Sequence, residues 1–208
     1  MAKLQSLRGQ IYDLLLDRIK TGYYPNEEKL NEEALMEEFG ISRTPIREAF
    51  IQLAANGFLE NRSRKGFYVK TISLQEVNEN YGIVARLDAY AAELAFDNLT
   101  RNDYAEMQSC IDSMNVSIEA GDYNAYDAAQ AEFHSIYLKK CGNRQLIELV
   151  QSLNSKFVST VVLYPDQANL KQHCLEYNKQ HLDILTQFRD GTVESAVDAV
   201  FRHWSVDI

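Results

Sequence analysis

Apolar residues recur at helical spacing through the first part of the chain. The stripe from Leu7 to Leu15 repeats every three or four positions, which is typical of an amphipathic helix, and Gly22 follows where a glycine can end it. A second stripe lies within EEALMEEF, directly after the capping residue Asn31, and a third fills residues 42–57. The pattern therefore predicts three helices with short connections.

The start of the third predicted helix carries residues suited to DNA. Two short helices joined by a turn of about three or four residues form a helix-turn-helix, whose second helix presents its first turns to base edges. Arg43 and Arg47 are four residues apart on the face opposite the apolar stripe, so both can reach guanine edges. Ser42 and Thr44 suit phosphate oxygens. The plain alternative is that both arginines are solvated surface residues.

A basic turn separates two short apolar segments that follow this helix. Residues 58–61 and 67–69 have the composition of strands, and the segment RSRKG joins them. The pattern predicts a β-hairpin with Arg64, Lys65 and Gly66 near its tip. After a recognition helix, such a hairpin is a wing whose cations can bind phosphates or enter the minor groove.

Helical spacing continues to the end of the chain, without a strand pattern of weight. Ser73 with Glu76 three residues later is a capping-box signature, so a new helix and a new domain are expected to begin there. The further predicted helices are 74–97, 101–119, 123–140, 143–163, 169–189 and 192–205. We expect a mainly α protein, with a winged helix-turn-helix and its small β-hairpin at 1–72 and an all-α helical bundle at 73–208.

Charge is distributed unevenly between these two domains. The net charge is −9, which taken alone argues against a nucleic-acid partner. Residues 1–72 nevertheless carry 11 Lys and Arg against 10 Asp and Glu, a net of +1, which leaves −10 for residues 73–208. Within residues 42–70 the local net charge is +4. Phosphates should repel the acidic bundle, so the N-terminal domain is the expected DNA-binding part.

Cysteine usage and hydropathy indicate the compartment. The three cysteines lie at wide spacings without a CxxC pair, so we expect reduced thiols rather than disulfides or a thiolate metal site. No run approaches the roughly 18 apolar residues of a membrane span, and the N-terminus lacks the apolar core of a signal peptide. The protein is therefore expected in the cytoplasm, without a membrane partner.

Three of the four histidines fall on separate predicted helices of the bundle. His134, His181 and His203 could meet at one cation, because metal sites in bundles are built from side chains of facing helices. No compact HExxH spacing supports such a site, and the plain alternative is that each is a core or surface histidine. His173 takes that plain interpretation.

The run FGISRTPIREAFIQLAANGFLENRSRKGFYV resembles the winged helix of GntR-family bacterial transcription regulators. Members of that family carry a similar (V/I)SRTP(V/I)REAL segment and a wing that ends in an RxGxxV-like stretch. The resemblance implies contacts with operator DNA by the matching residues Ser42, Arg43, Thr44, Arg47 and Gly66. Glu33 is a departure, because some members place a DNA-contacting arginine there.

The segments AEFHSIYLKKCGNRQL and NKQHLDILTQFRDGTVESAVDAVFRHW resemble the FCD type of ligand-binding domain, the C-terminal effector domain of one large GntR subfamily. In that domain an Asp-x-x-x-His pair and two later histidines hold zinc, nickel or manganese beside a small carboxylate effector. The resemblance thus implies a divalent metal at His134, His181 and His203. Gln130 stands at the aspartate position, and a neutral amide is a weaker ligand than a carboxylate.

The first helix of this domain departs from the family at a second position. The subfamily usually has R-x-x-L-E, whose arginine meets the effector, whereas Val84 occupies that place ahead of Leu87 and Asp88. Arg86 is the remaining candidate for effector binding, although it points about 200° away from Val84 on a helical wheel. We therefore expect an effector less acidic than a di- or tricarboxylate, such as a simple organic acid or a sugar acid.

Together the resemblances imply an effector-responsive transcription regulator that binds a pseudopalindromic operator as a homodimer. Two alternatives stay open. A three-histidine site with an open coordination position could belong to a metal-dependent hydrolase or isomerase, although such an enzyme would explain nothing in residues 1–72. The departures at Gln130 and Val84 also fit a regulator that binds DNA constitutively and has a degenerate effector pocket.

Overall fold

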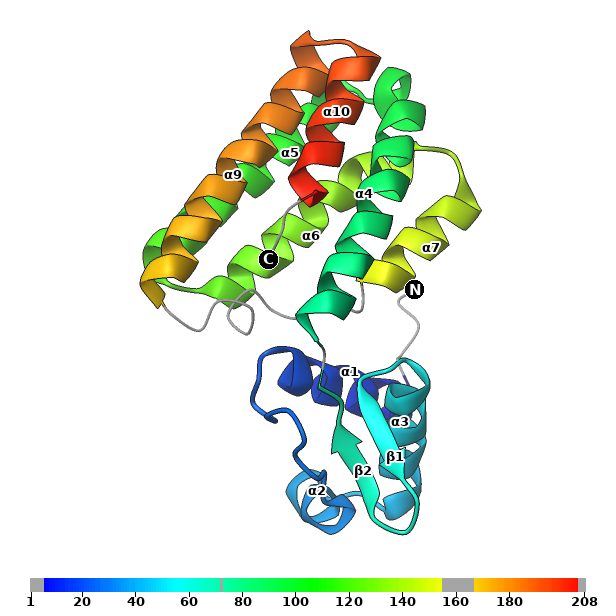
Figure 1. The fold of residues 1–208 in the computed structure, drawn as a ribbon. Coiled ribbons are helices and arrows are strands. Elements are labelled where there is room, and N and C mark those ends of the chain that lie inside the picture. Colours follow the sequence, from blue (N-terminus) through cyan, green and yellow to red (C-terminus); the bar gives the residue numbers. More distant parts are fainter. Residues whose placement is uncertain (1–5, 72, 155–166, 206–208) are drawn as a thin grey trace. The chain divides into compact units, whose positions relative to one another are not determined.

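The computed structural model describes residues 6–71, 73–154 and 167–205, which form two compact units, residues 1–72 and residues 73–208 (Figure 1). The described chain is mainly helical, with a two-stranded antiparallel hairpin in the first unit. This confirms the predicted fold class. Within the described ranges, no helix is both long enough and apolar enough to cross a lipid bilayer.

The first unit is built around its third helix. Its elements are α1 (Leu7–Lys20), α2 (Glu32–Phe39), α3 (Arg43–Ala55), β1 (Leu59–Arg62) and β2 (Gly66–Val69). Helix α3 packs against α1, α2 and β1, and Ile46, Phe50 and Leu53 on its inner face are fully buried. Burial of each such side chain stabilises the unit by about 1.5–3 kcal/mol. The outer face of the first turns of α3 is thereby held toward solvent.

Local hydrogen bonds explain where α2 begins and ends. The Asn31 side chain accepts hydrogen bonds from the backbone N–H groups of Glu33 and Ala34 at 2.9 and 3.3 Å, as the sequence predicts. Gly40 ends the helix with a φ of 65°, which favours glycine. Ser42 stands directly before α3, where a serine is typical of a helix cap, but its side chain makes no capping hydrogen bond, so the sequence signal for a side-chain cap is wrong here. The Ser42 hydroxyl, which is exposed, is therefore not committed to the helix.

The hairpin is anchored on both sides. Its strands pair from Leu59 with Val69 to Arg62 with Gly66. The segment before α2 lies along the other edge of β2, where the backbone N–H of Leu30 donates to the carbonyl of Phe67 at 3.0 Å. Gly66 has a φ of 101°, so the turn depends on glycine there. Backbone hydrogen bonds therefore fix the strands that carry the tip.

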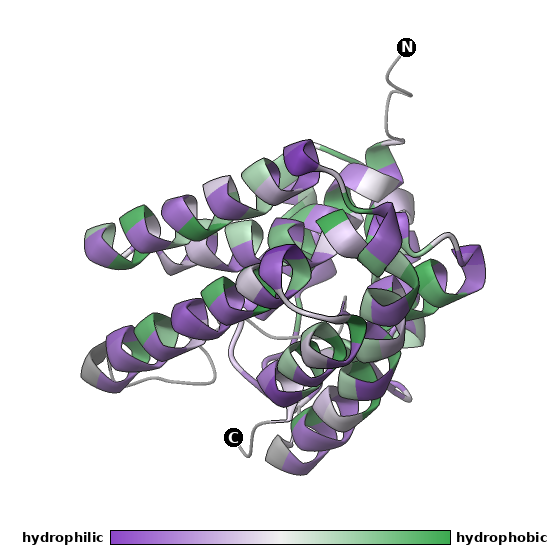
Figure 2. Cartoon of the chain, turned by 90° about the horizontal axis from the view of Figure 1, so that it is seen from above, coloured by the Kyte–Doolittle hydropathy of each residue, from purple (hydrophilic) through white to green (hydrophobic). Residues whose placement is uncertain are grey.

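The second unit is all helical among its described residues. Its elements are α4 (Leu74–Ala95), η1 (Phe96–Asn98), α5 (Arg101–Ala120), α6 (Tyr123–Lys140), α7 (Arg144–Asn154), α9 (Gln167–Asp190) and α10 (Val193–Trp204). Each matches a predicted helix to within a few residues, and the latter part of the segment predicted at 143–163 lies outside the described residues. Hydrophilic and hydrophobic residues are interspersed along the helices, as amphipathic packing requires (Figure 2).

Helices α4, α6, α9 and α10 of this bundle contribute side chains to its interior. Helix α10 packs against α4 and α9, whereas α6 packs against α4 and α5. The predicted capping box at Ser73 and Glu76 begins α4, and similar boxes begin α5 and α10. The side chains that α4, α6, α9 and α10 turn inward make up the candidate site described below.

Candidate DNA-binding surface and histidine cluster

The start of α3 presents an exposed polar surface. Ser42, Arg43, Thr44 and Arg47 are all exposed, on the side opposite the buried residues of the helix. Within the part of the chain that the structure describes, no acidic side chain forms an ion pair with Arg47. Its guanidinium is thus available to a base edge or a phosphate.

Arg43 differs, because two carboxylates of α2 hold it. Its Nε lies 3.3 Å from Oε2 of Glu32, and its Nη2 lies 3.1 Å from Oε1 of Glu33. From the sequence, Glu33 was interpreted as suited to the N-terminal end of α2 and as a lost DNA contact, and this pairing was missed. The available signal was a pair of carboxylates in the first turn of α2 and an arginine at the first position of α3.

The wing carries its free charges at the tip. Arg64 and Lys65 are exposed, and the described residues offer them no carboxylate within ion-pair distance. Arg62, the last residue of β1 before the turn, instead pairs with Glu27 and with Glu60, and its guanidinium lies 4.4 Å from the Tyr68 ring centre. These hydrogen bonds raise the pKa of Arg62 above its usual value. Arg62 therefore fastens the hairpin to the segment before α2.

The three histidines singled out from the sequence meet inside the second unit. His134 comes from α6, His181 from α9 and His203 from α10, and each is at most 3% exposed. Their potential ligand nitrogens all lie within 4.8 Å of one another, and the Nε2 atoms of His134 and His181 are 3.3 Å apart. The cluster has the size of a site for one metal ion.

The other residues considered from the sequence are Gln130, Arg86 and His173. Gln130 is half-buried and precedes His134 by one turn of α6. Arg86 is exposed, and its guanidinium lies 4.2 Å from the ring centre of Phe201. His173 lies against Tyr177, with the ring centres 4.1 Å apart. Arg86 is therefore not part of the buried cluster, because its side chain is exposed to solvent.

Burial favours the neutral form of two of the clustered imidazoles, those of His181 and His203. It lowers the pKa of His181 and of His203 well below the usual value for histidine, and the neighbouring imidazoles lower both further. His181 Nδ1 and His203 Nε2 are buried and lack a hydrogen-bond partner in the described structure. Neutral imidazoles with unused nitrogens are what a divalent transition metal requires, so the residues present fit such an ion.

A buried carboxylate, missed by the sequence reasoning as part of the site, lies beside His134. Asp88 of α4 is fully buried, and its Oδ2 accepts hydrogen bonds from the Tyr137 hydroxyl and from Trp204 Nε1, the latter at 2.7 Å. His134 Nδ1 lies 2.7 Å from the Tyr137 hydroxyl and 3.3 Å from the same carboxylate oxygen. Burial and the nearby carboxylate raise the pKa of Tyr137 well above its usual value. The position of Asp88 one turn after Val84 was the available signal.

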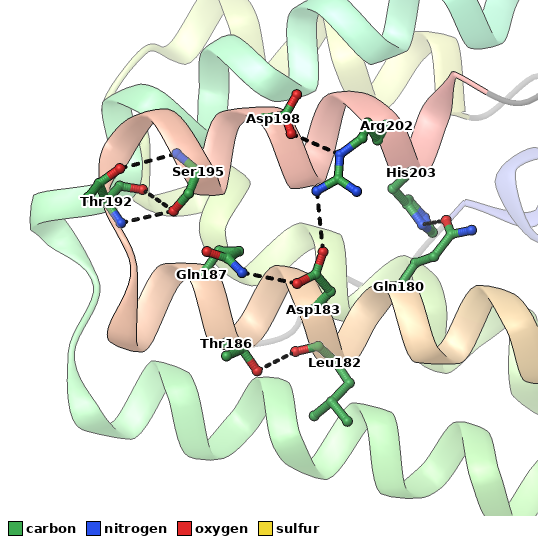
Figure 3. A network of polar contacts seen from close by, with 10 residues as sticks. All are labelled: Gln180, Leu182, Asp183, Thr186, Gln187, Thr192, Ser195, Asp198, Arg202 and His203. Atoms are coloured by element: carbon green, nitrogen blue, oxygen red, sulfur yellow. Dashed lines mark hydrogen bonds and ion pairs between the residues drawn. The ribbon is translucent and has the colours of Figure 1, made fainter.

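His203 has an outer partner of a different kind. Its Nδ1 lies 3.1 Å from Oε1 of Gln180 on α9. Figure 3 shows the two side chains facing each other. The amide oxygen is an acceptor, so Nδ1 carries the proton of this neutral imidazole and Nε2 carries the lone pair. Outer partners of this kind fix the orientation of metal-binding histidines.

Comparisons with known proteins agree with this arrangement. Residues 7–69 match the family model described as bacterial regulatory proteins, gntR family, and residues 79–206 match the FCD domain model. The chain is 26% identical over 196 residues to the HTH-type transcriptional repressor RspR of Escherichia coli, covering 93% of this chain and 85% of that protein. It is likewise 26% identical over 199 residues to the HTH-type transcriptional regulator YdhC of Bacillus subtilis, covering 95% of this chain and 88% of that protein.

Solved structures share the fold. E. coli McbR/YncC superposes with a TM-score of 0.81 at 22% sequence identity, covering 97% of this chain and 94% of that one. A putative GntR regulator from Rhodococcus sp. RHA1 gives a TM-score of 0.79 at 20% identity, covering 96% and 94%. The family and the names of its relatives indicate a transcription regulator and not an enzyme. The chain belongs to the GntR family of bacterial regulatory proteins, in the group with a C-terminal FCD domain, and is a DNA-binding transcription regulator.

Proposed function

We propose that this regulator binds a pseudopalindromic operator as a homodimer and changes its DNA affinity when a small molecule binds in the second unit. Residues 1–72 bind the DNA, and residues 73–208 form the dimer and bind the effector. A twofold dimer matches a twofold operator. The observation that carries the ligand-responsive part is the buried histidine cluster with its unpartnered nitrogens.

The DNA contacts come from α3 and the wing. Arg43 and Arg47 contact base edges, Ser42 and Thr44 contact phosphates, and the wing reaches the backbone or the minor groove through Arg64, Lys65 and Gly66. Named relatives include RspR and a probable D-xylose utilization operon repressor of Paenarthrobacter nicotinovorans. By analogy with these two repressors, we propose that this chain represses transcription in the cytoplasm.

The effector site is centred on the histidine cluster. His134, His181 and His203 would hold a divalent metal, and three nitrogen donors favour zinc or nickel over manganese. When bound, such an ion supplies a Lewis-acid position for one carboxylate of the effector. Among the described buried residues there is no lysine or arginine to neutralise a second carboxylate. A monocarboxylic organic acid or a sugar acid therefore fits better than a di- or tricarboxylate.

The operator-binding part is tested by replacing Arg47 with alanine. Sequences selected from random DNA by the wild-type protein provide the operator. Since a bidentate arginine contact contributes about 1–3 kcal/mol of discrimination, Arg47→Ala should weaken operator binding by about 5- to 150-fold. The matched control is Arg144→Ala, which removes an exposed arginine of α7. Wild-type operator affinity in Arg47→Ala would contradict the assignment of α3.

Effector response is tested in the same binding assay. Operator affinity is measured with and without zinc or nickel, and with a panel of mono-, di- and tricarboxylic acids and sugar acids. A change of affinity with one class identifies the effector chemistry. Affinity that no compound alters would instead support a constitutive regulator.

A further inference from the structure

We propose that Asp88 and Tyr137 are positioning residues for the histidine cluster, acting through His134. They hold the His134 imidazole in the tautomer that has its proton on Nδ1 and its lone pair on Nε2. This inference rests on the proposed metal site, because the lone pair matters only if an ion or ligand uses it. The tautomer itself is a property of the metal-free protein.

The hydrogen-bond directions determine the tautomer. The Tyr137 hydroxyl donates its proton to Oδ2 of Asp88, so its oxygen can only accept from His134 Nδ1, 2.7 Å away. The second neighbour of that nitrogen is Oδ2 of Asp88 itself, at 3.3 Å, and a carboxylate is also an acceptor. Both neighbours of Nδ1 therefore require a proton on it. A neutral imidazole then keeps its lone pair on Nε2.

That lone pair points into the cluster. His134 Nε2 lies 3.3 Å from His181 Nε2, whereas Nδ1 faces away from the cluster toward α4 and the Tyr137 hydroxyl. His203 is fixed in the same tautomer by Gln180. Outer partners thus fix the tautomer of two of the three imidazoles, and in both of them Nε2 carries the lone pair. This is the state needed before an ion arrives.

Asp88 also links the helices that carry two of the histidines. Its Oδ2 accepts from Trp204, which follows His203 directly in α10, while Tyr137 lies one turn after His134 in α6. The Trp204 and His134 ring centres are 4.7 Å apart. One carboxylate on α4 therefore sets the distance between α6 and α10 at the level of the cluster. Both hydrogen bonds go to Oδ2, whereas the buried Oδ1 of Asp88 has no hydrogen-bond partner in the described structure.

The first measurement is the tautomer in the wild-type protein. With only four histidines in the chain, selective ¹⁵N labelling of histidine gives a small set of side-chain signals, in which long-range ¹⁵N–¹H correlations separate the two tautomers. We expect His134 as the Nδ1–H form in metal-free protein. Observation of the Nε2–H form would overturn the proposal, and this measurement needs no variant that folds.

The second measurement is metal affinity by calorimetric titration with Zn²⁺ and with Ni²⁺ alone. Loss of an outer partner typically weakens metal binding 10- to 100-fold, and we expect that range for Tyr137→Phe. The matched control is Tyr126→Phe, since Tyr126 is a fully buried α6 tyrosine whose hydroxyl has no hydrogen-bond partner in the described structure. Asp88→Asn should weaken binding at least as much as Tyr137→Phe.

The outcomes distinguish the positioning role of Asp88 and Tyr137 from the proposed metal site on which it rests. Equal affinities of Tyr137→Phe and wild type would overturn the positioning role while leaving the metal site intact. If the wild type binds neither ion, the proposed metal site fails, and the tautomer of His134 alone then supports or overturns the role of Asp88 and Tyr137. Weakening by Tyr126→Phe to the same extent would also overturn it, because any buried hydroxyl would then have the same effect.

Discussion

At the scale of single residues, Arg43 shows how a DNA-contacting side chain can be held before DNA is present. Its two ion pairs are exposed, so each contributes at most about 1 kcal/mol to stability. Their effect on orientation is larger, because a guanidinium has five N–H donors and can keep a carboxylate while it binds a base. Glu33 is thus expected to favour sequence discrimination over general affinity.

Replacement of Glu33 with glutamine tests this role. Removal of one negative charge beside the phosphates should raise affinity for random-sequence DNA several-fold, while the ratio of operator to random-sequence affinity should fall. Both affinities are measured by fluorescence anisotropy at one salt concentration. Glu37→Gln on the same helix is the control, since it removes an exposed charge that has no ion pair with Arg43. Equal effects of the two variants would leave no role for the pairing.

At the scale of elements, one carboxylate both starts α5 and joins it to α6. Asp103 Oδ2 accepts from the backbone N–H and the hydroxyl of Thr100 at 2.8 and 2.6 Å, and it lies 2.9 Å from Nζ of Lys140. The hydrogen bonds from Thr100 and the ion pair with Lys140 lower the pKa of Asp103. A carboxyl group whose pKa is lower in the folded than in the unfolded protein stabilises the folded state when the pH is above the unfolded pKa. This stabilisation is lost as the pH falls through the folded pKa.

Asp103→Asn is therefore expected to destabilise the protein by about 1–2 kcal/mol at neutral pH, the usual range for a lost cap. The difference from wild type should shrink as the pH falls below about 4, where the wild-type carboxyl also becomes neutral. Urea unfolding at several pH values measures both effects. Asp112→Asn, an exposed carboxylate on the same helix, should show little of either. A pH-independent difference would contradict the assigned charge effect.

The elements themselves were largely predictable from the sequence, because the signals that begin and end them are local. Asn31 and the Ser73–Glu76 pair cap helices through residues two or three positions away, and both predictions are confirmed. Contacts between distant elements were not predictable in this way. Asp88 and Trp204 are 116 residues apart, and only the packing of α4 against α10 brings them together.

The meeting of the three histidines was partly predictable from the sequence. The helical assignments made convergence of His134, His181 and His203 conceivable, and the resemblance to the FCD domain singled them out. Helical spacing also indicated that Arg86 faces away from Val84, and the structure has Val84 buried and Arg86 exposed. Neither the outer partners of the histidines nor the pairing of Arg43 could follow from spacing alone, because each depends on side chains of another helix.

At the scale of the whole molecule, few cations remain for DNA. The basic segment 42–70 has a net charge of +4, yet Arg43 and Arg62 are already paired with carboxylates. The second unit, with a net charge of −10, adds repulsion from phosphates. Binding should therefore depend on a small set of charges whose number can be counted from salt dependence.

The salt dependence of operator binding gives that count. Each phosphate contact contributes about −0.9 to the slope of log affinity against log salt concentration. In a homodimer, replacement of both Arg64 and Lys65 by alanine removes up to four such contacts, so the slope should become shallower by about 3–4. The control is Lys179→Ala on α9, a lysine paired with Glu176. An unchanged slope in the double variant would show that the wing tip does not lie on the phosphates.

Helix α4 carries Asp88 fourteen residues after its first residue, a distance of about 21 Å along the helix axis. The chain leaves β2 at Val69 and enters α4 at Leu74, so the DNA-binding unit is tethered to the N-terminal end of this same helix. A twist of α4 about its long axis would separate Asp88 from Tyr137 and Trp204 and would simultaneously turn the point of attachment. Helix α4 therefore joins the histidine cluster, through Asp88 and its hydrogen bonds, to the tether of the DNA-binding unit.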